Sequence, residues 1–140
     1  MSKRFTTTPI HEGGCFCGAV RYRVAGEPSS SVICHCESCR RASGAPAVAW
    51  VTFQRTCFEI VAGKPAVFHS SPGVVRQFCG TCGSALTYFN ATCPISVDVT
   101  AGTLDEPDAF PPTAEIWLEN RLHWQPVDPA LDQYVGSTSG

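Results

Sequence analysis

Short apolar segments follow one another along the chain, and Gly, Pro, Ser or Asp separates each from the next. The clearest is residues 19–24, in which Val20, Tyr22 and Val24 alternate with two arginines. Alternation with a period of two is typical of a strand that buries one face. Similar patterns predict eight more strands, at residues 31–35, 47–53, 58–62, 66–69, 74–78, 85–89, 95–99 and 114–117.

Helical patterns are nearly absent from the chain. Residues 36–43, which end before Gly44, predict one or two helical turns, and residues 104–107 predict a short turn. Eleven prolines and twelve glycines punctuate the rest, as is usual in all-β domains built from many short strands. We therefore predict an all-β fold of several short antiparallel strands.

The 140 residues suit a single domain that can bury a core without disulfides. No linker divides them. The polar, Thr-rich start predicts an N-terminal arm at residues 1–10, followed by the domain at residues 11–125. Residues 126–140 contain two prolines and end in Gly-Ser-Thr-Ser-Gly. We expect this tail to wrap the surface and then fray.

Composition and charge exclude several classes of function. Apolar residues make up 44% of the chain, which excludes intrinsic disorder, and the ten basic residues form no stripe of the kind that nucleic-acid binding needs. No apolar run approaches the roughly 18 residues of a membrane span, and none follows the charged N-terminus as a secretory signal would require. We expect a cytoplasmic protein. The sequence leaves its oligomeric state open.

Cysteine is unusually frequent, with nine in 140 residues. Disulfides are rare in reducing compartments, so dense cysteines there indicate metal binding or redox chemistry. Spacings of one or two residues also let neighbouring thiolates reach one tetrahedral ion. Seven of the nine form two sets: a four-cysteine cluster made of two pairs (Cys15, Cys17, Cys79 and Cys82) and a cysteine trio (Cys34, Cys36 and Cys39).

Ligand counting separates the two sets. A structural zinc takes four protein ligands, which the four-cysteine cluster supplies, whereas a zinc with three protein ligands keeps a position for water or substrate. We therefore expect two zinc ions per chain, one closed and one open, with partial occupancy allowed at the open one. In the alternative, both sites only stabilise the fold and the trio gains a fourth ligand such as His35. Four sulfurs could equally hold iron.

Other residues have two interpretations each. His35 would point away from its neighbouring cysteines in an extended segment, which favours a supporting or packing role over direct ligation. Cys57 and Cys93 lie singly in apolar stretches and are expected to be buried. Arg40 and Arg76 are candidate anchors for a substrate carboxylate, or else partners in structural ion pairs. We expect the three tryptophans to serve in packing, although one of them could line a pocket. They are Trp50, Trp117 and Trp124.

Four motifs resemble a known family in their order, spacing and flanking residues. They are Gly-Cys-Phe-Cys-Gly-Ala-Val-Arg-Tyr at 14–22, Cys-His-Cys-Glu-Ser-Cys-Arg at 34–40 with Ser-Gly-Ala at 43–45, Arg-Gln-Phe-Cys-Gly-Thr-Cys-Gly-Ser at 76–84, and Gly-Thr-Leu-Asp at 102–105. The family is that of the glutathione-dependent formaldehyde-activating enzymes, which also includes the centromere protein V group. The resemblance runs from about residue 11 to residue 124.

The resemblance implies a tent-like zinc-binding β-fold. It implies a structural zinc at the four-cysteine cluster, a catalytic zinc at the trio, and condensation of formaldehyde with glutathione, formally a carbon-sulfur lyase reaction run in reverse. In this chain Glu115 stands where a histidine is expected in the family strand. We predict a zinc-dependent carbon-sulfur lyase-type enzyme acting on an adduct of glutathione or a similar thiol. The alternative is a non-enzymatic zinc module that carries a thiol metabolite or binds a protein partner.

Overall fold

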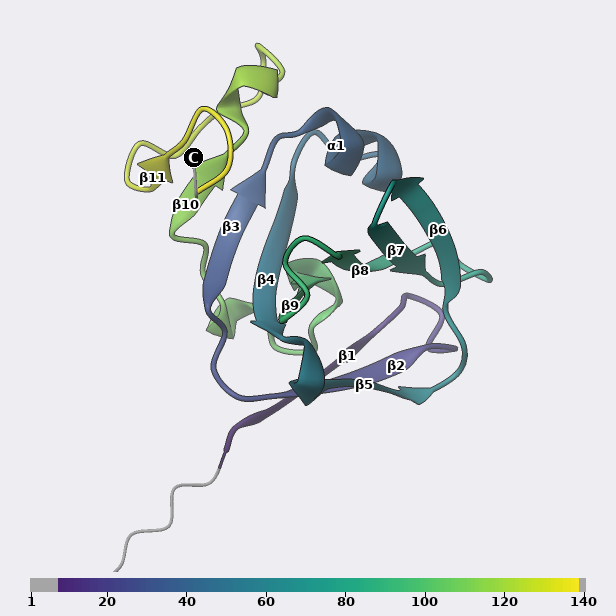
Figure 1. Cartoon of the computed structure of the whole chain (residues 1–140). Helices are drawn as coiled ribbons and strands as arrows, with labels where there is room; N and C mark the ends of the chain where they lie inside the picture. Colours follow the sequence, from purple (N-terminus) through teal and green to yellow (C-terminus); the bar gives the residue numbers. More distant parts are fainter. Residues whose placement is uncertain (1–7, 139–140) are drawn as a thin grey trace, which may run out of the picture.

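The computed structural model describes residues 8–138 and places them in two β-sheets and one α-helix (Figure 1). The smaller sheet has the strand order β1 (Ile10–Gly14), β2 (Arg21–Ala25) and β5 (Phe58–Ala62). The larger sheet has the order β11 (Asp132–Gln133), β10 (Ala114–Ile116), β3 (Ser30–Cys34), β4 (Val48–Gln54), β9 (Ser96–Thr100), β8 (Ala85–Asn90), β7 (Val74–Phe78) and β6 (Ala66–Ser71). Helix α1 (Glu37–Ser43) connects β3 to β4.

The mostly β architecture with antiparallel sheets confirms the predicted fold class. Two strand pairings are parallel instead, those of β10 with β3 and with β11. Short 3-10 turns complete the chain: η1 (Arg55–Cys57), η2 (Ala101–Thr103), η3 (Pro107–Ala109) and η4 (Leu118–Asn120). Every strand predicted from alternation is present, with ends that shift by a residue or two.

Strand β1 was not predicted, because Ile-His-Glu-Gly-Gly lacks an apolar alternation. Pairing with β2 forms it, and its glycines are required by close approach. A Cβ on Gly13 would collide with the hydroxyl of Tyr22 and with the carbonyl of Thr103. The strand begins at Ile10, the last residue of the expected N-terminal arm. Residues 1–7 of that arm lie outside the described residues.

The main core lies between the two sheets. Tyr22 and Val24 from β2 meet Val51 and Phe53 from β4, and all four side chains are essentially fully buried. Each such side chain contributes about 1.5 to 3 kcal/mol through removal of apolar surface from water. The smaller sheet therefore serves as a base for the larger one, and α1 lies at the opposite end of the molecule (Figure 1).

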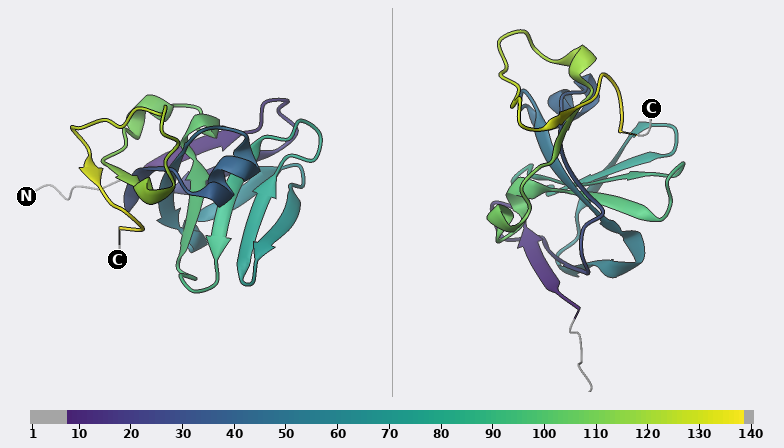
Figure 2. Two further views of the ribbon diagram at one scale, coloured as in Figure 1. Left: turned by 90° about the horizontal axis from the view of Figure 1, so that it is seen from above. Right: turned by 90° about the vertical axis from the view of Figure 1, so that its left-hand side faces the viewer.

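A second, smaller core lies on the opposite face of β3 and β4 and includes Val32, Trp50 and Ala114. The C-terminal segment covers its edge: β11 pairs with β10, and Tyr134 packs against this core. Figure 2 shows the segment gathered beside β10, away from the smaller sheet. The tail thus wraps the surface as expected, and its last residues, 139–140, lie outside the described part.

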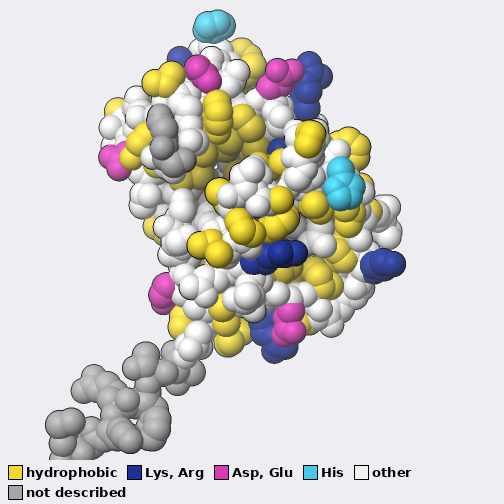
Figure 3. Space-filling model, viewed as in Figure 1, with side chains coloured by type: hydrophobic (Ala, Val, Ile, Leu, Met, Phe, Trp, Pro, Cys, Tyr) yellow, Lys and Arg dark blue, Asp and Glu magenta, His cyan; other side chains and the backbone are white. Residues whose placement is uncertain are grey.

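Surface charge is mixed on the face that Figure 3 shows, where basic and acidic side chains are scattered among apolar ones without a basic stripe. Among the described residues, no helix is long and apolar enough to cross a membrane.

Candidate metal centres and adjoining pocket

The four-cysteine cluster brings together residues from two distant parts of the chain. Its Sγ atoms lie within 4.8 Å of one another, with 3.6 Å between Cys15 and Cys17 and 3.7 Å between Cys17 and Cys79. Sulfurs placed about 2.3 Å from a tetrahedral zinc are separated by about 3.8 Å. The spacing of the cluster therefore fits one zinc ion.

Hydrogen-bond donors surround these sulfurs. The amide of Val20 donates to Cys15 Sγ at 3.2 Å, and this bond lowers the pKa of the Cys15 thiol. Ser84 lies 3.2 Å from Cys82 Sγ, and its hydroxyl is the main cause that lowers the pKa of Cys82 to about 5. Donors of this kind stabilise thiolates, the form that binds metal.

The trio is assembled where β3 ends and α1 begins. Cys34 is the last residue of β3, Cys36 is the N-cap of α1, and Cys39 lies in its first turn. The Cys36 sulfur accepts the cap hydrogen bond from the Cys39 amide at 3.2 Å. Hydrogen bonds from Cys34 and then Cys39 lower the pKa of Cys36 to about 2, while the same contacts raise that of Cys34. A lowered thiol pKa favours the thiolate, the form that binds metal.

Three ligand atoms define this second site. Its Sγ atoms also lie within 4.8 Å of one another, and in the described part of the chain no histidine, carboxylate or further cysteine joins them at that distance. The donor set fits a zinc ion that keeps one coordination position for a small molecule.

His35 lies between two trio residues but outside their sulfur cluster. Its side chain is buried, and its Nε2 lies 2.7 Å from Oε1 of Glu115. Glu115 in turn accepts a hydrogen bond from the backbone amide of Asp128. The extended backbone turns the imidazole away from the sulfurs, as alternation predicts. Glu115 is therefore the partner of this histidine.

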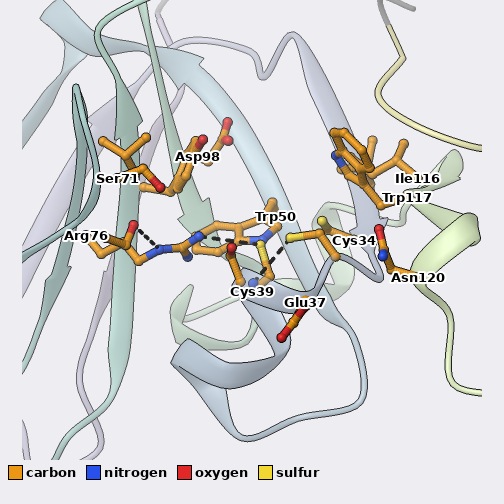
Figure 4. Close-up of a pocket in the computed structure, with 16 residues that line it drawn as sticks. Cys34, Glu37, Cys39, Trp50, Ser71, Arg76, Asp98, Ile116, Trp117 and Asn120 are labelled. Atoms are coloured by element: carbon orange, nitrogen blue, oxygen red, sulfur yellow. Dashed lines mark hydrogen bonds between the residues drawn. The ribbon is translucent and has the colours of Figure 1, made fainter.

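A pocket of about 400 Å³, which we call the trio pocket, opens beside the cysteine trio. A row of register partners forms its floor: Arg76 on β7 faces Tyr88 on β8, and Tyr88 faces Asp98 on β9. Paired residues of neighbouring strands point to the same face. Figure 4 shows Arg76 reaching toward Cys39 from one side of the pocket, with residues of β10 and η4 on the other side.

Arg76 carries the buried positive charge of this pocket. The residue is 8% exposed; its Nε donates to Ser70 Oγ at 3.0 Å, its Nη2 lies 3.9 Å from Cys39 Sγ, and the guanidinium stacks 4.9 Å from the Tyr88 ring. None of the ion pairs within residues 8–138 includes Arg76. The charge faces the thiols and is free to meet an anionic ligand. Arg40, the other candidate anchor, does not line the trio pocket.

Asp98 carries the complementary charge on the same floor. Burial raises the pKa of its carboxyl, and the Thr52 hydroxyl donates to Oδ1 at 2.6 Å. Sequence reasoning missed Asp98, Tyr88 and Asn120 as pocket residues. For Asp98 a signal existed, because an acidic residue stands between two valines in the segment Val-Asp-Val of β9.

The remaining candidates divide between pocket, core and surface. Trp50 and Trp117 line the trio pocket, whereas Trp124 is 70% exposed. Trp117 has a φ of 57°, a left-handed conformation that is costly for a bulky residue and recurs at functional sites. Cys57 packs partly buried against the main core. The expected burial of Cys93 is wrong, because it lies in the exposed turn between β8 and β9.

Comparison with known proteins finds a matching family and similar sequences. Residues 10–120 match the family described as "Glutathione-dependent formaldehyde-activating enzyme". A protein of Halomonas elongata named "Putative glutathione-dependent formaldehyde-activating enzyme" is 31% identical over 128 residues, covering 84% of this chain and 80% of that protein. A protein of Schizosaccharomyces pombe named an uncharacterized lyase is 33% identical over 92 residues, covering 60% of each chain.

A crystal structure of a Rhodobacter sphaeroides protein shares the fold, with a TM-score of 0.58 and 20% identity over 88% of this chain and 98% of that one. The family match covers both cysteine sets and the strands that carry the pocket floor. The chain belongs to the glutathione-dependent formaldehyde-activating enzyme family.

Proposed function

We propose that this protein is a zinc-dependent carbon-sulfur lyase-type enzyme that forms or cleaves the adduct between an aldehyde and glutathione or a similar thiol. The supporting observation is the trio of cysteines, which no fourth ligand joins within residues 8–138, placed on the wall of a pocket that also holds a buried guanidinium. A zinc ion held by the trio would lower the pKa of a thiol and polarise a carbonyl oxygen.

The two cysteine sets have different roles in this proposal. The four-cysteine cluster holds a structural zinc that ties the turn after β1 to the turn after β7. The trio of Cys34, Cys36 and Cys39 holds the working zinc, for a total of two ions per chain. The trio lines the pocket, whereas the four-cysteine cluster does not.

Two charged side chains of the pocket floor assist the binding of substrate and the transfer of a proton. Arg76 presents a fork of donors that suits a carboxylate or a developing oxyanion. Asp98 has a carboxyl whose pKa is raised by burial, so it can exchange a proton near neutral pH more readily than an exposed carboxyl. Both side chains stand on central strands of the larger sheet, which hold them in place.

Addition of the thiol to the aldehyde needs no further reactant. The thiol sulfur bonds to the carbonyl carbon, the π pair of the carbonyl moves to oxygen, and the proton lost by the thiol ends on that oxygen. Cleavage is the reverse. Because glutathione and formaldehyde also combine spontaneously, the enzyme must hold the two together and stabilise charge on sulfur and oxygen.

A carrier role is the second candidate. Three thiolates around Zn²⁺ leave a net charge of about −1, which weakens Lewis acidity and favours exchange of bound thiols. In that case the protein binds glutathione without accelerating the reaction.

Magnetisation exchange between labelled formaldehyde hydrate and S-hydroxymethylglutathione separates these functions. The lyase proposal predicts exchange faster than the spontaneous rate with the wild-type protein, and loss of that acceleration in Cys36→Ser with the fold retained. Cys93→Ser, which changes an exposed cysteine outside both sets, is the matched control and should keep it. Binding of glutathione with no acceleration would favour the carrier. Wild-type turnover in Cys36→Ser would contradict the role of the trio.

A further inference from the structure

A second cavity, which we call the side chamber, adjoins the trio pocket and has a volume of about 590 Å³. Five residues line both spaces, so the two share a wall: Ser38, Cys39, Trp50, Ser70 and Arg76. A group bound at the trio therefore lies next to the side chamber, with Cys39 at the border between the two spaces. The chamber is a branch of the same site.

The lining of the side chamber is mainly apolar. Phe68 on β6, Ala42 on α1, Phe78 on β7 and Ala85 on β8 line it, and Phe68 shares the face of its register partner Arg76. Phe68 is 60% exposed, although a large apolar side chain on a strand is ordinarily covered. A ligand that covered it would remove apolar surface from water.

The distribution of charge indicates that the two spaces bind different parts of a substrate. The side chamber has one charged group beyond the shared Arg76 among its lining residues, Arg41, and that side chain is 72% exposed and paired with Glu37 at 3.0 Å. Glutathione carries two carboxylates and an ammonium, and burying them against apolar walls would be costly. The trio pocket, with Asp98 and Asn120, offers polar partners instead.

We propose that the side chamber binds an apolar substituent of the aldehyde, so that the preferred substrates are alkyl aldehydes and their thiol adducts. This inference rests on the proposed function, and it extends it because formaldehyde has no substituent that could occupy the chamber. The carbon-sulfur bond forms at the aldehyde carbon, the thiol proton ends on the aldehyde oxygen, and the alkyl chain stays unchanged in the chamber.

Comparison of acetaldehyde, butanal and hexanal with glutathione tests the chamber, because the carbonyl reactivity of these straight-chain aldehydes is similar. Burial of each methylene should raise kcat/KM roughly two- to fourfold, which gives an increase of roughly 16- to 250-fold over the four methylenes between acetaldehyde and hexanal. Phe68→Asp places a charge in the chamber wall and should reduce the hexanal-to-acetaldehyde ratio to about a third or less. Val61→Asp changes an exposed apolar residue on β5 that lines neither space and should keep the ratio.

A binding measurement gives a second readout that needs no turnover. Titration with 1-hexanol, which has the chain but no carbonyl, should shift the methyl NMR signals of Ala42 and Ala85 and leave those of Val61 in place. Absence of these shifts overturns the chamber assignment whatever the activity.

The kinetic outcomes separate the two proposals. Absence of acceleration with every aldehyde contradicts the proposed function, whereas acceleration that does not rise with chain length contradicts only the side chamber. Strand β6 ends the larger sheet, so a second copy of the chain is the competing occupant. A dimer in sedimentation equilibrium that Phe68→Asp dissociates would also overturn the proposal.

Discussion

His35 and Glu115 form a buried pair, with Nε2 and Oε1 2.7 Å apart and side-chain exposures of 0% and 3%. The pair joins the segment that carries the trio to β10. Because Glu115 also accepts the backbone amide of Asp128, the contact extends to the C-terminal segment. The backbone amide of His35 donates to the carbonyl of Ile116 at 3.0 Å, beside the same contact. This pair fixes the position of the trio relative to the pocket wall formed by β10 and η4.

Removal of the carboxylate should destabilise the fold. Glu115→Ala leaves the imidazole of His35 buried without its partner, and we expect a loss of about 2 to 4 kcal/mol in the free energy of unfolding. Glu115→Gln keeps an acceptor oxygen near Nε2 and should lose clearly less. Urea unfolding at matched zinc content measures both. Equal stability of Glu115→Ala and the wild type would show that the pair has no structural role.

Loss of one ligand at the four-cysteine cluster should unfold the domain more readily. Cys79 is 1% exposed and accepts amide hydrogen bonds from Thr81 and Cys82 at 3.4 Å. Because structural zinc binding is coupled to folding, Cys79→Ser should lose one zinc ion per chain and several kcal/mol of stability. Elemental analysis and thermal unfolding test this, with Cys93→Ser as the control. A stable, folded Cys79→Ser protein would mean that the cluster is not the structural site.

Arg76 should contribute to substrate binding through its fork of donors. Arg76→Met is expected to lower kcat/KM for glutathione roughly 10- to 100-fold, the effect of a lost charge-assisted hydrogen bond, and Arg76→Lys should recover part of it. Arg55, whose guanidinium stacks 4.2 Å from the Phe89 ring outside the trio pocket, provides a matched control. If Arg55→Met and Arg76→Met lowered kcat/KM equally, the effect would be one of packing.

Asp98 should make the protein less stable as the pH rises. Burial raises the pKa of its carboxyl in the folded state, so the folded protein holds this proton where the unfolded chain has lost it, and stability falls as pH rises through the folded pKa. Asp98→Asn removes the charge and should raise Tm more at pH 8 than at pH 5, while lowering turnover. Asp108→Asn, at an exposed position, is the control. A gain in Tm that is the same at both pH values would contradict the burial of charge.

Local patterns were sufficient to predict most strands and the two cysteine sets. Alternation placed Val20, Tyr22 and Val24 on the buried face of β2, and spacing grouped the sulfurs. Strand β1 was missed, since its formation depends on close packing of Gly13 against Tyr22 rather than on its own pattern. Cys93 was misplaced because an apolar neighbourhood in the sequence does not reveal an exposed turn.

The pocket floor could not be predicted from the sequence alone. Arg76, Tyr88 and Asp98 come from three strands, and only the register between those strands places them in one row. The partner of His35 was equally hidden, because Glu115 is 80 residues away and reaches it through the parallel pairing of β10 with β3. Sequence spacing identifies ligands that are close in the chain, whereas long-range topology decides what surrounds them.

Zinc K-edge absorption on the protein purified without chelator, combined with zinc content per chain, tests the central claim most directly. We predict two zinc ions that share seven cysteine sulfurs, so an average of about three and a half sulfurs per ion, which rises to about four when glutathione is added. One zinc ion per chain, or two ions with four sulfurs each before any thiol is added, would contradict a closed site beside an open one.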